Sequence, residues 1–595
     1  MQKRLSNLAM AFGIIGVTAA MVAVAAPPPS AKKQPSFSNI GLTTGKAGGT
    51  LTLALGSAPT TFMYYGAIDG AAQRVAQNMF NGLIESNIAT GKIEPALAES
   101  WSVSSDGKSY TFKLRQGVKW HDGVEFTADD VVFTFDQIIA NKEARGGDFA
   151  NFSSGGVKFK FEKLGKYEVR FTLPFSSGAF LVQMRTFIMP KHKLLKFTEE
   201  GGGKAADING AWGTNSNLAD IVGTGAYKLS SYTANQKVVL EKNPDFWAID
   251  SKNNALPYIN KLEYLVLIGP AAQEAAFKNG TLDALDISGA QFPDYKAQER
   301  SGAKLKVVSQ LKDAIYGSPP HLAFNFVAKD AALAKVFSDL RFRKAIQFAV
   351  NRKRIIDDVY NGQAQLPGHM GVPPAGRFYT NTTRYLGDFD LKAANAALDA
   401  MGLRDTDSDG VRNISATKQL EFSLTYGTDS TIWVPLANIF QNDFKSIGVK
   451  VNLKGVLSST LLGTGLGSDW EAIFVALGDQ PDPELRKPIW QPGGSLYYWN
   501  QATKPLVAGG PANFARMTNW EKRLYDIFDK GTKSSNQNER LALYQEGQQI
   551  LGQYMPVIMI AKPANITVVR DTLSNFVYSL GVIPGYNPQP FFYFK

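Results

Sequence analysis

The chain has 595 residues, 44% of them hydrophobic and 11% aromatic, which indicates a globular protein long enough for about four average domains. Its formal net charge of +11 is spread along the sequence without clustered Lys and Arg or a nucleic-acid reading motif, which argues against a nucleic-acid partner. The positive charge is better interpreted as a basic surface near anionic lipid headgroups. The absence of cysteine excludes disulfides, thiolate chemistry and zinc sites built on sulfur.

The N-terminus has the pattern of a secretory signal peptide over residues 1–25. Lys3 and Arg4 precede an apolar run over residues 8–24, and Ala23-Val24-Ala25 fits an A-x-A cleavage site. A retained membrane anchor is the alternative, but the run is short for a spanning helix and no stop-transfer charges follow closely. We expect a flexible leader over residues 26–45.

The stretch over residues 110–139 carries the densest local signals. Tyr110, Phe112 and Leu114 alternate with polar residues, which predicts a strand with one buried face, and a short second strand is predicted around residues 118–120. Asp122-Gly123 supplies the positive φ of a tight turn. Thr127 then caps a predicted helix that has acidic residues in its first turn and an apolar stripe.

The rest of the chain alternates between strand and helix patterns, which argues for an α/β protein with a β-rich insertion. An early helix is predicted over 71–83, and a later one over 271–279 should end at Gly280. Two helices are predicted within 339–361, meeting at Asn351 as a cap. Strands are predicted at 48–55, 262–268, 282–287, 321–326, 422–426, 449–453 and 472–477, a hairpin at 157–173, and further helices at 432–447, 521–531 and 538–554.

Several segments carry a family resemblance. The string FxLRxGVKWHDGxxFTADDVVFTF (112–135) resembles the signature of the family-5 extracellular solute-binding proteins, the peptide-type receptors of ABC importers. GTGAYKL (223–229), NPDFW (243–247) and DLRFRKAIQFAVNRKRII (339–356) are similar to further family segments, with Ala226 where proline is usual and Asn351 where aspartate is common. The resemblance covers about residues 45–585.

The resemblance implies a two-lobed periplasmic-binding-protein fold of type II, in the large class with an extra inserted domain and with lobes joined by two crossing strands. It implies the following division: signal peptide 1–25, leader 26–45, lobe I 46–92, inserted domain 93–217, lobe I again 218–316, lobe II 317–562, and a return to lobe I 563–595.

The most informative polar element follows the predicted strand 472–477. Asp479 and Asp482-Pro483 lie where the chain leaves the sheet, and ligands in open α/β sheets gather at such strand ends. In peptide-binding family members a D-x-x-D-P element here supplies the aspartate that receives the peptide's α-ammonium, and the resemblance places Asp479 in that role. A short exposed acidic turn is the alternative.

Aromatic residues on either side of Asp479 are further candidates for ligand contact. Such rings could wall side-chain pockets or stack on sugar faces, although most are expected in the core. The candidates are Trp433, Trp470, Trp490, Tyr497, Tyr498 and Trp499.

One acidic loop has a partial calcium-binding pattern. Asp405, Asp407 and Asp409 alternate before Gly410, as in the first half of an EF-hand loop, but the twelfth position is Ala416 rather than glutamate. We interpret the loop as an Asp-rich turn and keep an ion site as a weak alternative. No cofactor is predicted.

The sequence shows no arrangement typical of an enzyme. The Gly-Gly-Gly-Lys run at 201–204 lacks P-loop spacing, no G-x-S-x-G or H-E-x-x-H occurs, and the four histidines are isolated. His121 and Asp122 are neighbours in a turn whose side chains point apart, so a catalytic dyad is not expected.

The family resemblance, together with the signal peptide, implies a periplasmic receptor that captures an oligopeptide-like solute between two lobes and delivers it to the permease subunits of an ABC transporter. We expect a monomer. We also expect no lipid anchor, because the chain lacks the cysteine to which such an anchor is attached. A receptor for an oligosaccharide or other non-peptide solute is the alternative, and a secreted hydrolase is the alternative from another class.

Overall fold

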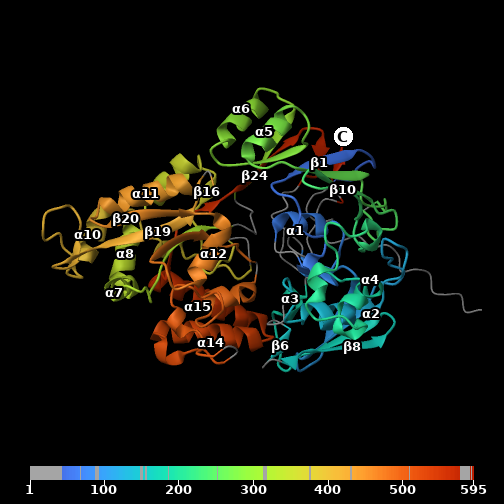
Figure 1. Ribbon diagram of the computed structural model, residues 1–595, viewed down its shortest axis with the longest axis horizontal. Helices are drawn as coiled ribbons and strands as arrows, with labels where there is room; N and C mark the ends of the chain where they lie inside the picture. Colours follow the sequence, from blue (N-terminus) through green and yellow to red (C-terminus); the bar gives the residue numbers. More distant parts are fainter. Residues whose placement is uncertain are drawn as a thin grey trace, which may run out of the picture.

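The computed structural model describes residues 43–595 apart from gaps at 67–68, 87–92, 148–151, 155–156, 185, 251, 312–317, 374–376, 429, 431, 481, 508–509, 577–589 and 591. The predicted signal peptide and nearly all of the leader lie outside the described residues. Two arms meet at one end, near α5 and α6, and extend side by side from there (Figure 1). Within the described ranges, no helix combines the length and the apolar character that a membrane crossing requires.

The first arm begins with a four-stranded sheet in the order β1 (Thr50–Leu55), β12 (Lys261–Val266), β11 (Lys237–Lys242), β10 (Tyr227–Thr233). The predicted helix over 71–83 is shorter than expected, because α1 spans Gly70–Ala76. The carbonyls of Asn78 and Met79 instead accept hydrogen bonds from the backbone of Tyr227 and Gly225, at 3.0 and 2.8 Å. The competing partner is about 150 residues away in sequence, so local periodicity could not reveal it.

The second half of the first arm holds a sheet in the order β4 (Ala98–Val103), β5 (Ser109–Leu114), β9 (Glu168–Thr172), β8 (Lys160–Gly165). The hairpin β8–β9 is confirmed. Helix α2 (Ala128–Phe133) begins at Thr127 with the predicted cap, completed by Asp130 as a capping box, and continues into a π-helical turn over Thr134–Ile139. The predicted strand near 118–120 is wrong, because its backbone forms one bridge, Lys119 to Glu125, around the tight turn at Gly123.

The second arm is built on a five-stranded sheet in the order β20 (Lys450–Val456), β19 (Glu421–Gly427), β21 (Ala472–Ala476), β15 (Pro320–Phe324), β22 (Val557–Met559). One face packs Leu322, Phe324 and Phe474 against a core that includes residues of α7 (Ala331–Ser338), α8 (Leu340–Ala349), α10 (Leu391–Asp399) and α11 (Trp433–Lys445). Asn351 caps the next turn, α9 (Arg352–Arg354), as predicted.

The opposite face of the same sheet packs Ala323, Ile473 and Val475 into a second core, to which α14 (Asn519–Lys533) and α15 (Gln537–Tyr554) contribute. Alternate residues of β15 and β21 therefore face two different cores. Helices α12 (Ser458–Leu466) and α13 (Lys487–Trp490) also contribute to this side.

The arms are joined at a three-stranded junction sheet in the order β13 (Ala284–Ile287), β24 (Asn565–Arg570), β14 (Leu305–Gln310). Helices α5 (Pro270–Lys278) and α6 (Phe292–Arg300) lie beside it (Figure 1), and Gly280 follows the end of α5 as predicted, with a φ of 89°. The chain passes to the second arm between β14 and β15. It returns between β22 and β24 through β23 (Lys562–Pro563), which pairs with β16 (Ala364–Gln365). These are the two expected crossings, while the exact domain boundaries stay a prediction.

The arms touch again at the end remote from the junction sheet, where α14 and α15 approach the part of the first arm near α3 (Phe180–Gln183) and β6 (Ser153–Ser154) (Figure 1). The backbone N–H of Gly178 donates to the carbonyl of Ser534 at 2.9 Å, and the hydroxyl of Ser176 donates to the carbonyl of Lys533 at 2.5 Å. The amide of Gln537 donates to the carbonyl of Gly178 at 3.2 Å. We call this group of residues the far contact.

The remaining elements are short. They are α4 (Lys191–Leu194), β2 (Ile84–Ser86), β3 (Ile93–Pro95), β7 (Val157–Lys158), β17 (Asn413–Ser415), β18 (Lys418–Gln419), β25 (Leu573–Ser574) and β26 (Tyr593–Phe594), with a π-helical turn over Ile355–Val359 and several 3-10 turns.

Candidate solute-binding site

Asp479 lies just beyond the end of β21, between the sheet and the turn that leads to Pro483. It is 4% exposed, and its Oδ2 lies 2.9 Å from the Nζ of Lys562. Lys562 belongs to β23, on the second crossing, and its side chain is 2% exposed. The aspartate singled out from sequence is therefore one half of a buried ion pair, and the alternative of an exposed acidic turn is wrong.

Asp482 forms a second buried ion pair in the same element. Its two oxygens accept hydrogen bonds from Nη1 and Nη2 of Arg540 at 2.9 and 2.8 Å, and its Oδ1 accepts the backbone N–H of Glu484 at 3.0 Å. Burial alone would lower the pKa of Arg540, but the negative charge of Asp482 raises it above its ordinary value. Asp482 thus fixes the turn before Pro483 and ties it to α15.

A second cation influences Asp479. Arg486 lies close enough to Asp479 for their charges to interact, and its Nε donates to the carbonyl of Gly478 at 2.7 Å. Burial raises the pKa of Asp479 while the positive charge of Lys562 opposes that rise. Burial lowers the pKa of Arg486, while the negative charge of Asp479 opposes that fall. The carboxylate thus contacts one cation, Lys562, and is influenced by the charge of a second, Arg486.

The segment around Gly371 covers Asp479. The carbonyl of Gly371 accepts the backbone N–H of Gln480 at 2.9 Å. A β-carbon at Gly371 would lie 3.8 Å from Oδ1 of Asp479 and 3.6 Å from Nε1 of Trp490, and the residue has a φ of 61°. This segment therefore connects Asp479 to one of the candidate aromatic residues.

The candidate aromatic residues mostly form one cluster. Ring centroids are 5.6 Å apart for Trp490 and Trp499, 4.4 Å for Tyr497 and Trp499, and 6.1 Å for Trp470 and Tyr498. All five are buried in the second core of the second arm. Their contact with a solute stays a prediction.

Two of the aromatic residues lie apart from Asp479. Trp470 precedes β21 whereas Asp479 follows it, so these two residues lie at opposite ends of the strand. Trp433, in the first turn of α11, is half-buried and packs on Phe474 with ring centroids 5.5 Å apart. Among the candidates, Trp490 is the one placed beside the segment that covers Asp479.

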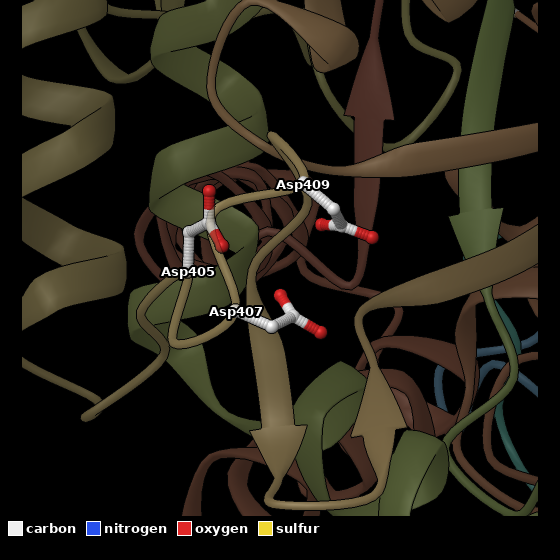
Figure 2. Close-up of side chains that lie close together, drawn as sticks. All are labelled: Asp405, Asp407 and Asp409. Carbon is white, nitrogen blue, oxygen red and sulfur yellow. The ribbon is translucent and has the colours of Figure 1, made fainter.

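The acidic loop at Asp405, Asp407 and Asp409 is exposed, and the three carboxylates lie within 4.8 Å of one another (Figure 2). Asp405 accepts backbone N–H groups of Ser408 and Gly410 at 2.7 and 2.9 Å. Asp409 accepts that of Val411 at 2.9 Å and also the amide of Gln419. The loop's own hydrogen bonds account for these two aspartates, and a cation site there stays a prediction.

The ring of His121, the histidine beside Asp122, contacts two backbone groups. Nδ1 of His121 accepts the N–H of Gly223, and Nε2 lies 3.1 Å from the carbonyl of Gly225. Asp122 instead lies 2.9 Å from Nε2 of His192. His121 and Asp122 thus have different hydrogen-bond partners.

Sequence reasoning missed Lys562, Arg540 and Arg486, the cations that interact with the two aspartates of the D-x-x-D-P element. Lys562 carried one signal that could have found it, because it is the single charged residue in the otherwise apolar stretch Met555-Pro-Val-Ile-Met-Ile-Ala-Lys-Pro563. A charge in such a stretch requires a buried partner.

Comparisons with known proteins agree with the two-armed architecture. The family model described as bacterial extracellular solute-binding proteins, family 5 Middle, matches residues 92–493. The di/tripeptide-binding protein 1 of Pseudomonas aeruginosa is 27% identical over 533 residues, which cover 84% of this chain and 86% of that protein.

Two solved structures show the same fold. The oligopeptide-binding protein AppA of Bacillus subtilis, in complex with a nonapeptide, aligns with a TM-score of 0.70 and 23% identity over 93% of this chain and 100% of its own. The periplasmic binding protein MelB of Agrobacterium fabrum, in complex with stachyose, aligns with a TM-score of 0.72 and 20% identity over 95% and 87%. Because the family model spans about two thirds of the sequence, the chain belongs to the bacterial extracellular solute-binding proteins, family 5.

Proposed function

We propose that this solute-binding protein captures an oligopeptide-like solute between its two arms, in the periplasm, and delivers it to the permease subunits of an ABC importer. The observation that carries the proposal is the family match over residues 92–493, which contribute to both arms. A relative named for di- and tripeptides, matched over most of both chains, supports peptides as the solute class.

The proposed mechanism is closure around the solute. The arms are joined by two crossings and touch again at the far contact. A solute that touches both arms stabilises the closed arrangement, and a permease that binds this arrangement selects loaded receptor. An extended peptide can also pair its backbone with strand edges, which gives affinity without reading side chains.

We propose Asp479 as the polar residue of the second arm that lies at one end of the solute, with Trp490 as its aromatic neighbour. The support is the position of Asp479 at the end of β21, next to the second crossing, where both arms are near. Trp433, Trp470, Tyr497 and Trp499 are weaker members of the proposed site, since most of them are buried in the core.

An oligosaccharide is the second candidate solute. The stachyose complex with the same fold and the aromatic content near Asp479 favour it, since rings can stack on sugar faces. We further propose that the receptor is monomeric, that it catalyses no reaction, and that it carries no thioether-linked lipid, because these 595 residues contain no cysteine.

Native mass spectrometry of protein purified from its periplasm tests the proposal. We expect a bound mass that fragments as a peptide, and a rise in melting temperature of the emptied protein when peptide mixtures are added back. At 100 times its dissociation constant a ligand adds about 2.7 kcal/mol of stability. Glycan fragments alone would favour the oligosaccharide candidate, and turnover of the added peptides would point to a hydrolase.

A further inference from the structure

The ion pair of Asp479 with Lys562 bears on which end of a solute this site accepts. An aspartate that receives a ligand ammonium gains affinity only if that ammonium supplies a charge that the unliganded protein lacks. Here Lys562 already supplies an ammonium at 2.9 Å, and both side chains are buried. A second cation, that of Arg486, also interacts with Asp479.

Lys562 is held in place by its backbone. Lys562 pairs with Gln365, Pro563 pairs with Ala364, and the N–H of Ala564 donates to the carbonyl of Gln363 at 2.8 Å. The N–H of Ile560 donates to the carbonyl of Pro320 at 3.1 Å. Because hydrogen bonds fix the chain on both sides, Lys562 could leave Asp479 only by moving its side chain.

Replacing Lys562 by a ligand ammonium is unfavourable for a simple reason. The carboxylate would exchange one ammonium partner for another, so it gains nothing, while the lysine would become a buried charge that has lost this partner. Adding the ligand ammonium beside Lys562 would place two ammonium groups against one carboxylate. Neither arrangement increases the affinity for a positively charged solute end.

We infer that Lys562 neutralises Asp479 from within the chain, so that the solute presents an uncharged end at this position, such as an N-acylated peptide terminus or a sugar hydroxyl. The inference rests on the proposed function and narrows its ligand class. It departs from the role that the sequence resemblance implied for Asp479, and Lys562 becomes a residue that determines specificity.

The test compares matched tripeptides with free and with N-acetylated termini, plus stachyose as a neutral glycan, by competition and mass spectrometry. The wild-type protein should bind acetylated and free forms within about threefold of each other. Lys562→Met leaves Asp479 as a buried anion that lacks this lysine, and should shift the preference toward free peptides by at least about thirtyfold. Lys329→Met, which removes an exposed lysine, is the control and should not shift it.

A wild-type preference of thirtyfold or more for free over acetylated peptides overturns the inference, even if Lys562→Met does not fold. An unchanged preference in folded Lys562→Met overturns it as well. Binding of stachyose without any peptide supports an uncharged end and contradicts only the proposed peptide class. If none of the probes binds and nothing co-purifies, the proposed function fails, and the inference fails with it.

Discussion

Removal of the charge of Arg540 should destabilise the second arm strongly. The side chains of Arg540 and Asp482 are 1% and 4% exposed, and Arg540 also donates to the carbonyl of Gly531 at 3.0 Å. Arg540→Met keeps an unbranched apolar stem and leaves Asp482 as a buried charge without this partner. Loss of one member of a buried pair costs about 3–5 kcal/mol. For a unit of about 250 residues, 1 kcal/mol corresponds to about 2 °C, so the melting temperature should fall by about 6–10 °C.

Differential scanning calorimetry measures this change, with Lys329→Met as the matched control. Lys329 also pairs with an aspartate, Asp469, but the two side chains are 68% and 83% exposed, so its melting temperature should not change measurably. The double variant Asp482→Leu with Arg540→Met should recover part of the loss, because an apolar pair needs no counter-ion. Equal melting temperatures for Arg540→Met and Lys329→Met would refute the reasoning.

Three further predictions concern other parts of the molecule. Thr127→Ala removes the cap of α2 and should lower the free energy of unfolding by about 1 kcal/mol, so an unchanged denaturation midpoint would contradict the capping role. At Gly178 an added β-carbon would lie 2.5 Å from the carbonyl oxygen of Ser534, so Gly178→Ala should part the arms and enlarge the radius of gyration in X-ray scattering, whereas Gly210→Ala, with nothing within 4 Å, should not. Burial lowers the pKa of His321 to about 4, so its ring stays neutral in the folded protein while the unfolded chain takes up a proton near pH 6.5. The free energy of unfolding should therefore fall as the pH drops from 6.5 toward 4. The urea midpoint of His321→Gln should drop less between pH 7.5 and 5 than that of the wild-type protein.

Features that depend on neighbouring residues could be predicted from the sequence. The cap at Thr127, the cap at Asn351 and the end of α5 before Gly280 each follow from residues within one or two turns, and all three are confirmed. The two-armed fold followed from motifs rather than from periodicity, since no local pattern states that β24 returns to lie between β13 and β14.

The electrostatics of the site could not be predicted in the same way. The sequence singled out Asp479 but gave it no partner, because Lys562 reaches it from the second crossing, far along the chain. The same holds for Asp482 and Arg540, which are 58 residues apart. The Asp479→Ala variant, a natural test on sequence grounds, would also leave Lys562 buried without its carboxylate, so a loss of binding in it would mix recognition with stability.

The far contact lies at the end of the arms that is remote from the two crossings (Figure 1). Since the two crossings lie beside the junction sheet and the far contact lies at the other end of the arms, a small rotation at the crossings would separate Gly178 from Ser534. Parting of the arms would therefore break the hydrogen bonds of the far contact. Because the chain has no cysteine of its own, cysteines introduced at Ser176 and Lys533 would be the sole sites for thiol-reactive labels. The distance between the two labels would report the rotation of one arm relative to the other.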